Sequence, residues 1–150
     1  MARYVMTVLV AGLLLGAEEK KSDFKKDREA LQGAWRVVSS EAGGKDQTEE
    51  FKDHLLIFEG DTFVLKKGDA VGLKGTFQLD PSKKPRAIDM TITEGGQEGD
   101  KGKVLHGIYE VDKGTLKWCT AEPGGTGRPK EFSTKEGINH MLVTLKKEKP

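Results

Sequence analysis

After Gly33 the apolar residues of this chain alternate with polar ones almost to the C-terminus, and this alternation limits the possible folds more than any other feature. Between Val71 and Leu79 every second residue is apolar or glycine. A period of two is typical of strands that bury one face. We find about eight such segments, at Trp35–Ser40, His54–Glu59, Thr62–Lys67, Val71–Leu79, Ala87–Thr93, Lys103–Val111, Thr115–Ala121 and Ile138–Lys146.

Short, evenly spaced strands without helical segments between them predict an antiparallel sandwich or an up-and-down barrel. They exclude a parallel sheet with crossover helices. The segment before them, Ser22–Gln32, predicts a short helix that begins at a serine cap and ends before Gly33. Its apolar residues are sparse, and we expect its charges of mixed sign to form a solvated face.

The N-terminal segment resembles a targeting sequence. Residues 1–17 contain one charge, Arg3, and an uncharged run, Tyr4–Leu15, that is too short for a membrane span of about 20 residues. Small residues follow, so we predict a signal peptide that is cleaved after residue 17, with a retained anchor as the alternative. The mature protein would be exported to the periplasm or the extracellular space, without a membrane span. It would consist of a helical lead-in, residues 18–30, and one domain, residues 31–147.

Charge and cysteine content exclude several classes of protein. The chain has 25 basic and 24 acidic residues, and removal of Arg3 with the leader leaves 24 of each. A balanced chain lacks the basic surface of a nucleic-acid binder or of a membrane-surface protein. The single cysteine, Cys119, cannot form an internal disulfide, so the fold must depend on its core. We expect Cys119 to be a half-buried strand residue rather than a reactive thiol.

Several short segments carry a family resemblance. They are Leu31–Val38, with its Gly33-Ala34-Trp35, then Phe58–Phe63, Leu79–Pro85 with Ile88-Asp89 after it, and Gly107–Tyr109. With these the chain resembles a lipocalin-type barrel, and it is more specifically similar to an uncharacterised lipocalin-like domain family of exported bacterial proteins, known mainly from planctomycetes. The resemblance implies an all-β, eight-stranded antiparallel up-and-down barrel with a short N-terminal helix. It implies no activity.

The same resemblance predicts how one end of the barrel is closed. Gly33 and Trp35 would form a structural base, with Trp35 as a plug. A cation from the last strand, Lys146 or alternatively Lys147, would lie over the Trp35 ring in place of the arginine that lipocalins use. Lysine stacks on an aromatic ring less well than arginine does.

The opposite rim is where we predict a binding site. In an up-and-down barrel the connections alternate between two rims, and three long ones, Glu41–Asp53, Gly95–Gly102 and Glu122–Gly137, fall on the rim away from Trp35. Binding residues concentrate in such loops, although the loops can also be simple insertions. The inward residues near this mouth, our predicted ligand contacts, are Val37, Leu65, Leu73, Ile92, Leu105, Trp118 and Met141.

Other candidate sites are weaker. His54, His106 and His140 all lie near the mouth-side starts of strands and could bind zinc, but the alternation turns His106 and His140 outward, which favours solvated histidines and no metal. The segment Pro123–Pro129 resembles a phosphate cradle but lacks the Gly-Lys-Ser/Thr ending, so a flexible hairpin loop is the better interpretation. We find no catalytic constellation and predict no cofactor.

The sequence therefore favours a non-enzymatic, exported domain that binds a small apolar or amphipathic molecule at the barrel mouth. The alternative is a barrel filled by its own side chains, which acts as a protein-interaction module through its long loops, because an eight-stranded barrel is just wide enough to be packed solid. An enzyme of unknown type is a third possibility. The sequence does not identify a protein partner.

Overall fold

The computed structural model describes residues 23–149, so the predicted signal peptide and its alternative, a retained anchor, lie outside the described residues. Within this range no helix combines the length and apolar character that a membrane crossing requires. Residues 23–31 form the N-terminal helix. The other elements are β1 (Gly33–Ala42), β2 (Lys45–Asp46), α2 (Thr48–Phe51), β3 (His54–Glu59), β4 (Thr62–Lys67), β5 (Ala70–Asp80), β6 (Ala87–Gly95), β7 (Val104–Asp112), β8 (Thr115–Ala121) and β9 (His140–Lys147).

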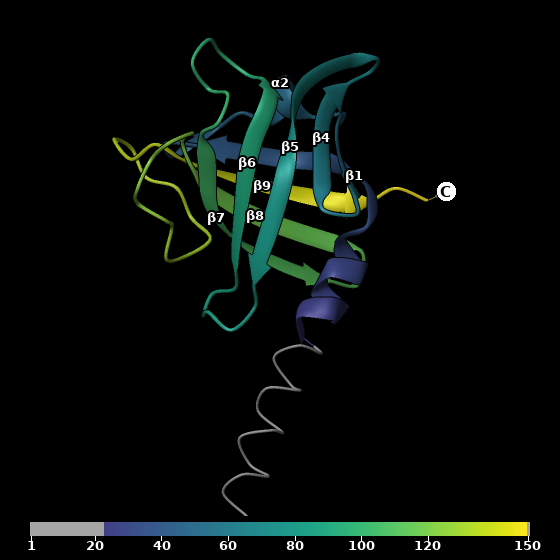
Figure 1. The fold of residues 1–150 in the computed structure, drawn as a ribbon. Coiled ribbons are helices and arrows are strands. Elements are labelled where there is room, and N and C mark those ends of the chain that lie inside the picture. Colours follow the sequence, from purple (N-terminus) through teal and green to yellow (C-terminus); the bar gives the residue numbers. More distant parts are fainter. Residues whose placement is uncertain (1–22, 150) are drawn as a thin grey trace, which may run out of the picture.

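The strands form a closed antiparallel barrel (Figure 1). β1 and β3 to β9 each pair with the next strand along the chain, and β9 pairs back with β1. This confirms the predicted eight-stranded up-and-down topology and the short N-terminal helix. Closure leaves no free edge along most of the wall, which removes the edge-strand pairing that open sheets must avoid.

One connection contains more structure than a loop. The segment predicted to run from Glu41 to Asp53 holds the two-residue strand β2, which pairs with the end of β1, and the short helix α2. β1 is also longer than predicted, and its pairing with β9 shifts register between Val37 and Ser39. Such a bulge leaves Val38 exposed while the residues on either side of it remain paired.

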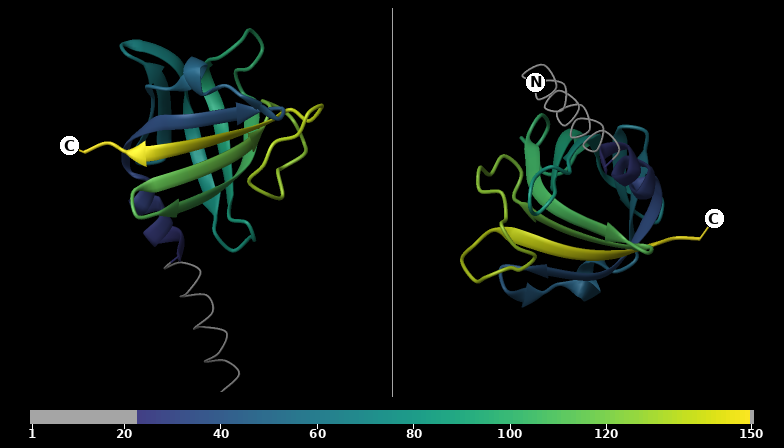
Figure 2. Two further views of the ribbon diagram at one scale, coloured as in Figure 1. Left: turned by 180° about the vertical axis from the view of Figure 1, so that it is seen from behind. Right: turned by 90° about the horizontal axis from the view of Figure 1, so that it is seen from below.

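The N-terminal helix lies against one end of the barrel (Figures 1 and 2). Gly33 joins it to β1 with φ of +109°, a backbone conformation that other residues rarely adopt. This turn brings Trp35 into the barrel interior two residues later. The short connections at residues 60–61, 81–86 and 113–114 lie at this helix end, which we call the base. The long connections at 43–53, 96–103 and 122–139 lie at the mouth.

Large apolar side chains fill the barrel interior. Aromatic rings occupy the space above inward-facing glycines: a Cβ atom at Gly75 would come within 2.7 Å of Phe63 Cε1, and one at Gly107 within 3.0 Å of Trp118 Nε1. The buried cluster consists of Leu31, Trp35, Val37, Leu56, Phe58, Phe63, Phe77, Ile88, Met90, Ile92, Leu105, Tyr109, Leu116, Trp118, Val143 and Leu145. It includes side chains from both halves of the barrel, so the interior forms one core.

Candidate functional site

A buried carboxylate attaches the N-terminal helix to the base. Asp27 is only 3% exposed and accepts hydrogen bonds from Arg86 Nη1, at 2.8 and 2.7 Å from its two oxygens, and from the Tyr109 hydroxyl at 2.6 Å. Burial and the hydrogen bond to Asp27 raise the pKa of Tyr109 above its ordinary value. The prediction that the helix charges form a solvated face is therefore wrong for Asp27, because its partners from β7 and the β5–β6 connection replace water.

Trp35 joins the same helix to the barrel. Its Nε1 donates to the Leu31 carbonyl oxygen at 2.8 Å, and Lys147 Nζ lies 5.5 Å from the centre of its ring. Lys147 is thus the cation over Trp35, and Lys146 is not. The register explains this, because Trp35 pairs directly with Lys147, and the side chain of Lys146 therefore points to the other face of β9.

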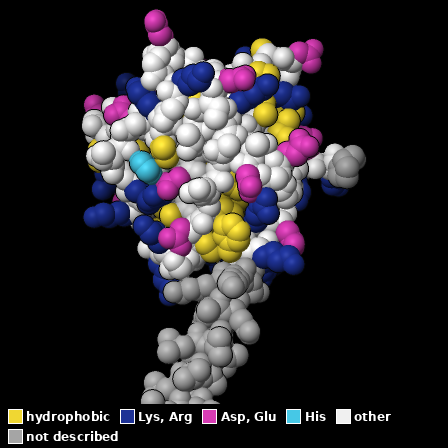
Figure 3. Space-filling model, viewed as in Figure 1, with side chains coloured by type: hydrophobic (Ala, Val, Ile, Leu, Met, Phe, Trp, Pro, Cys, Tyr) yellow, Lys and Arg dark blue, Asp and Glu magenta, His cyan; other side chains and the backbone are white. Residues whose placement is uncertain are grey.

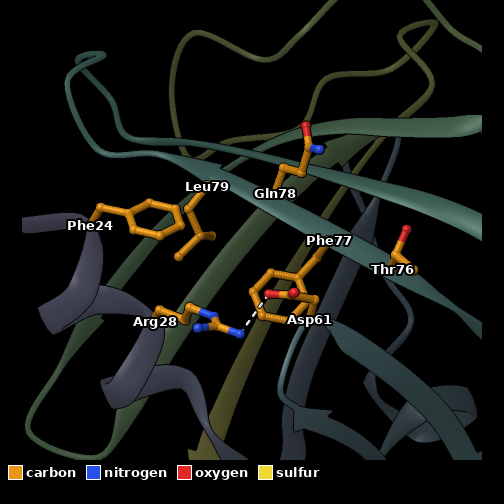
Figure 4. A pocket seen from close by; sticks show the side chains of 7 residues that line it. All are labelled: Phe24, Arg28, Asp61, Thr76, Phe77, Gln78 and Leu79. Carbon is orange, nitrogen blue, oxygen red and sulfur yellow. Dashed lines mark ion pairs between the residues drawn. The ribbon is translucent and has the colours of Figure 1, made fainter. Parts of the chain in front are cut away.

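A cavity of about 410 Å³ opens beside this base, between the helix and β5 (Figure 4). We call it the base-side cavity. Phe24 and Arg28 of the helix, Asp61 of the β3–β4 turn, and residues 76–79 of β5 line it. It exists because β4 begins at Thr62, which pairs with Thr76, so β5 continues past the end of β4 without a neighbouring strand on that side. The helix spans this gap without filling it.

The walls of the base-side cavity differ in chemistry. Figure 4 shows the rings of Phe24 and Phe77 and the Leu79 side chain on the apolar part, with Phe24 and Leu79 close together. Phe24 is 41% exposed. In the space-filling view, hydrophobic side chains gather on this face just above the grey N-terminal residues, with charges of both signs around them (Figure 3).

The polar part of the cavity is formed by Arg28, whose guanidinium group has few hydrogen-bond partners. Arg28 Nη2 is 2.7 Å from Asp61 Oδ1, and this ion pair crosses one side of the cavity (Figure 4). Arg28 Nε is inaccessible to solvent and forms no hydrogen bond within residues 23–149. The Asp61 side chain is 73% exposed, so its pairing with Arg28 is largely solvated and contributes little stability. A carboxylate that accepted hydrogen bonds from both terminal nitrogens, Nη1 and Nη2, would bind Arg28 better than Asp61 does.

The seven predicted mouth residues divide into two groups. Val37, Ile92, Leu105 and Trp118 are buried in the core, whereas Leu65, Leu73 and Met141 are partly buried and pack against it. None of these seven residues lines any of five surface cavities formed by residues 23–149. Ligand contact at these residues stays a prediction.

Two polar atoms face the interior near the mouth without a partner. Trp118 Nε1 and Ser40 Oγ are both inaccessible to solvent and form no hydrogen bond to any described residue. Trp118 and Ser40 both pair with Val143, from opposite sides of β9, so all three side chains share the inward face. A buried polar group without a partner is costly, and such groups commonly bind a water molecule or a ligand atom.

The three histidines have separate environments. His54 Nδ1 lies 2.9 Å from the Phe51 carbonyl oxygen, His106 Nδ1 lies 2.8 Å from Asp89 Oδ1, and His140 Nε2 lies 3.0 Å from the Gly127 carbonyl oxygen. In the described part of the chain no group of three His, Cys, Asp or Glu side chains is arranged to hold a metal ion.

The loop of residues 122–139 is held against the outside of the barrel. Arg128 donates to the Gly107 carbonyl oxygen and to Asp89 Oδ1, both at 2.7 Å. Burial raises the pKa of Asp89, but hydrogen bonds from His106 and Arg128 outweigh it, and the net pKa is lowered. The prediction of a flexible hairpin loop missed this anchoring by Arg128.

The same loop covers the only cysteine. Cys119 is fully buried rather than half-buried, and its thiol lies 3.7 Å from the Ser133 carbonyl oxygen. Burial raises the pKa of Cys119, so the thiolate form is disfavoured. Cys119 points to the outer face of β8, and the prediction of partial exposure was wrong because it did not include the loop that covers this face.

Sequence reasoning did not identify Asp27, Arg28 or Asp61 as site residues. Arg28 and Phe24 are four residues apart on the helix and therefore share a face, which was a usable local signal. Nothing in the sequence near Asp61 shows that β5 extends towards the base beyond the start of β4.

Comparisons of the chain with models of known protein families, with curated proteins and with solved structures found no match. Function is therefore inferred from the fold and from the residues that line its cavities.

Proposed function

We propose that this chain is a non-enzymatic, lipocalin-like binding domain that takes a small amphipathic carboxylate in the base-side cavity. The observation that carries the proposal is Arg28, whose guanidinium group lines a cavity of about 410 Å³ and is paired there, through Nη2, with the largely exposed Asp61. This volume lies in the range of about 300–1,000 Å³ that is typical of small-molecule sites. An apolar chain would pack on Phe24, Phe77 and Leu79, and its carboxylate would bind Arg28.

Asp61 supports the carboxylate as the polar group. Its own carboxylate already binds Arg28, through one nitrogen and from an exposed position. A ligand carboxylate would replace Asp61 and would accept hydrogen bonds from both terminal nitrogens of Arg28, because guanidinium and carboxylate groups match in a two-bond geometry. Asp61 is then a competitor within the protein, and its removal should strengthen binding.

This predicts opposite effects for two substitutions. We expect Arg28→Met to weaken the binding of decanoate at least tenfold, because a hydrogen bond to a charged group contributes about 1.5–3 kcal/mol. We expect Asp61→Asn to strengthen it several-fold. Isothermal titration calorimetry of the two variants and the unchanged protein would measure both effects.

Arg36→Met is the matched control. Arg36 is another half-exposed arginine and is paired with two carboxylates, Asp53 and Glu148, but it lies on β1 outside the cavity. Its removal should leave decanoate binding unchanged. Absence of decanoate binding to the unchanged protein would overturn the proposal, and so would equal weakening by Arg28→Met and Arg36→Met.

The proposal includes the family and the location of the protein. Membership of the lipocalin-like bacterial family is supported by the Gly33-Ala34-Trp35 segment and by the closed barrel with Trp35 at its base. Export is supported by the signal-like composition of residues 1–17 alone. The near-equal numbers of basic and acidic residues argue against nucleic acid as a partner.

A second candidate site is the mouth-side interior, as the sequence predicts. The unpartnered atoms Trp118 Nε1 and Ser40 Oγ favour it, since a ligand with a hydrogen-bond acceptor could satisfy both. Trp118→Phe would then abolish binding of such a ligand while Arg28→Met would not. We expect the reverse for decanoate, and titration of both variants with decanoate distinguishes the two sites.

A further inference from the structure

Beyond the closed part of the barrel, β5 has a free backbone edge that faces the base-side cavity. The β4–β5 pairing ends at Thr62 and Thr76, and the Phe77 N–H donates to the Asp61 carbonyl oxygen at 2.9 Å. The Phe77 N–H therefore points away from β6. Leu79 is two residues further along the strand, so its N–H and carbonyl group point the same way.

No described residue occupies that edge. Within residues 23–149 neither the Leu79 N–H nor its carbonyl oxygen has a hydrogen-bond partner on the side away from β6. Residues 77–80 extend past Thr76 by roughly 13 Å, at about 3.3 Å per residue. The N-terminal helix lies across the cavity from this edge, with Phe24 and Arg28 facing it (Figure 4).

We propose that the base-side cavity binds the C-terminal end of an extended peptide, which adds to β5 as a strand and places its carboxylate on Arg28. Strand addition supplies main-chain hydrogen bonds at Leu79, and an apolar last side chain packs against Phe24 and Leu79. The peptide carboxylate takes the place of Asp61 at the guanidinium. This inference rests on the proposed function and names the class of carboxylate.

The charges of the site fit a chain end better than an internal peptide segment. The backbone of an internal segment carries no charge that could pair with Arg28, whereas a chain end always supplies a carboxylate. A terminal carboxylate pairs with the terminal nitrogens of Arg28 and releases Asp61 to solvent, where it is already 73% exposed. The apolar wall then sets the preference for a leucine-like last residue.

The test compares three acetylated tripeptides ending in leucine on the full chain. One has a free carboxylate, one has a C-terminal amide, and one has a free carboxylate but N-methyl groups on its backbone amides. We expect the free acid to bind and to shift the amide resonance of Leu79 in the nuclear magnetic resonance spectrum. The amide and the N-methylated acid should each bind at least tenfold more weakly, since the first lacks the charge and the second lacks the strand donors.

Any other outcome overturns a specific part of the peptide proposal. Equal binding of the N-methylated acid overturns strand addition, and equal binding of the amide overturns carboxylate capture. If decanoate binds and no tripeptide does, the peptide inference fails and the proposed function stands. If neither decanoate nor any tripeptide binds, both fail. Arg36→Met serves again as the control, and it should leave the tripeptide affinities unchanged.

Discussion

Asp27→Ala is expected to lower the free energy of unfolding by about 3 kcal/mol, since it removes hydrogen bonds from a charged partner and leaves a buried hydroxyl unpaired. The Arg86 side chain is partly exposed and can be solvated again, but the Tyr109 hydroxyl cannot. Urea denaturation followed by circular dichroism measures the change. The helix should detach from the base before the barrel unfolds.

Glu29→Ala is the matched control for Asp27→Ala. Glu29 is an exposed carboxylate on the same helix and forms no side-chain ion pair within residues 23–149. Its replacement should change the stability by no more than about 0.5 kcal/mol. If the two alanine variants are equally stable, Asp27 does not anchor the helix.

Tyr109 gives a second readout of the same contact. The chain contains two tyrosines, Tyr4 and Tyr109, so in a Tyr4→Phe background the ultraviolet titration of tyrosine reports on Tyr109 alone. Its raised pKa means that the neutral phenol is favoured in the fold. The stability it contributes is fully present below the unfolded pKa near 10 and is lost as the pH rises above it. Asp27→Ala should move the titration of Tyr109 back towards the ordinary value.

The strands were predictable from sequence, whereas the contacts of the helix were not. Alternation is a local signal, and the eight predicted segments correspond to the eight barrel strands. The partners of Asp27 are 59 and 82 residues away in sequence, so no local pattern shows that this one helix charge is buried. The choice between Lys146 and Lys147 was also non-local, because it depends on how β9 is registered against β1.

The base-side cavity could not be predicted for a related reason. It depends on the difference between the end of β5 and the start of β4, and this difference is a property of the pairing register. Sequence reasoning used loop length as the signal for function and therefore looked to the opposite rim. Of the long loops there, the one of residues 122–139 is held down by Arg128, which lies between a glycine and a proline and carries no local sign of that contact.

Gly75→Ala is expected to destabilise the barrel by about 3 kcal/mol or more, because the added methyl group has no space. A Cβ atom at Gly75 would overlap the carbonyl oxygen of Thr91 on β6 and would come within 2.7 Å of Phe63 Cε1. The Thr91 contact is with backbone, so a change of rotamer cannot relieve it, and the two strands would have to separate at the point where their register shifts. Thermal unfolding followed by circular dichroism would measure the loss.

Two further variants identify the cause. Gly72→Ala lies on the same strand and brings its methyl group no closer than 3.5 Å to the Leu65 carbonyl oxygen, which is an ordinary contact, so its stability should change by less than about 1 kcal/mol. Phe63→Leu in the Gly75→Ala background relieves only the side-chain contact and should restore little stability. Full restoration would mean that Phe63, rather than the β6 backbone, requires glycine at this position. A Gly75→Ala variant as stable as Gly72→Ala would mean that β5 and β6 can separate at little cost, and the wall of the base-side cavity would then be far less rigid than its pairing indicates.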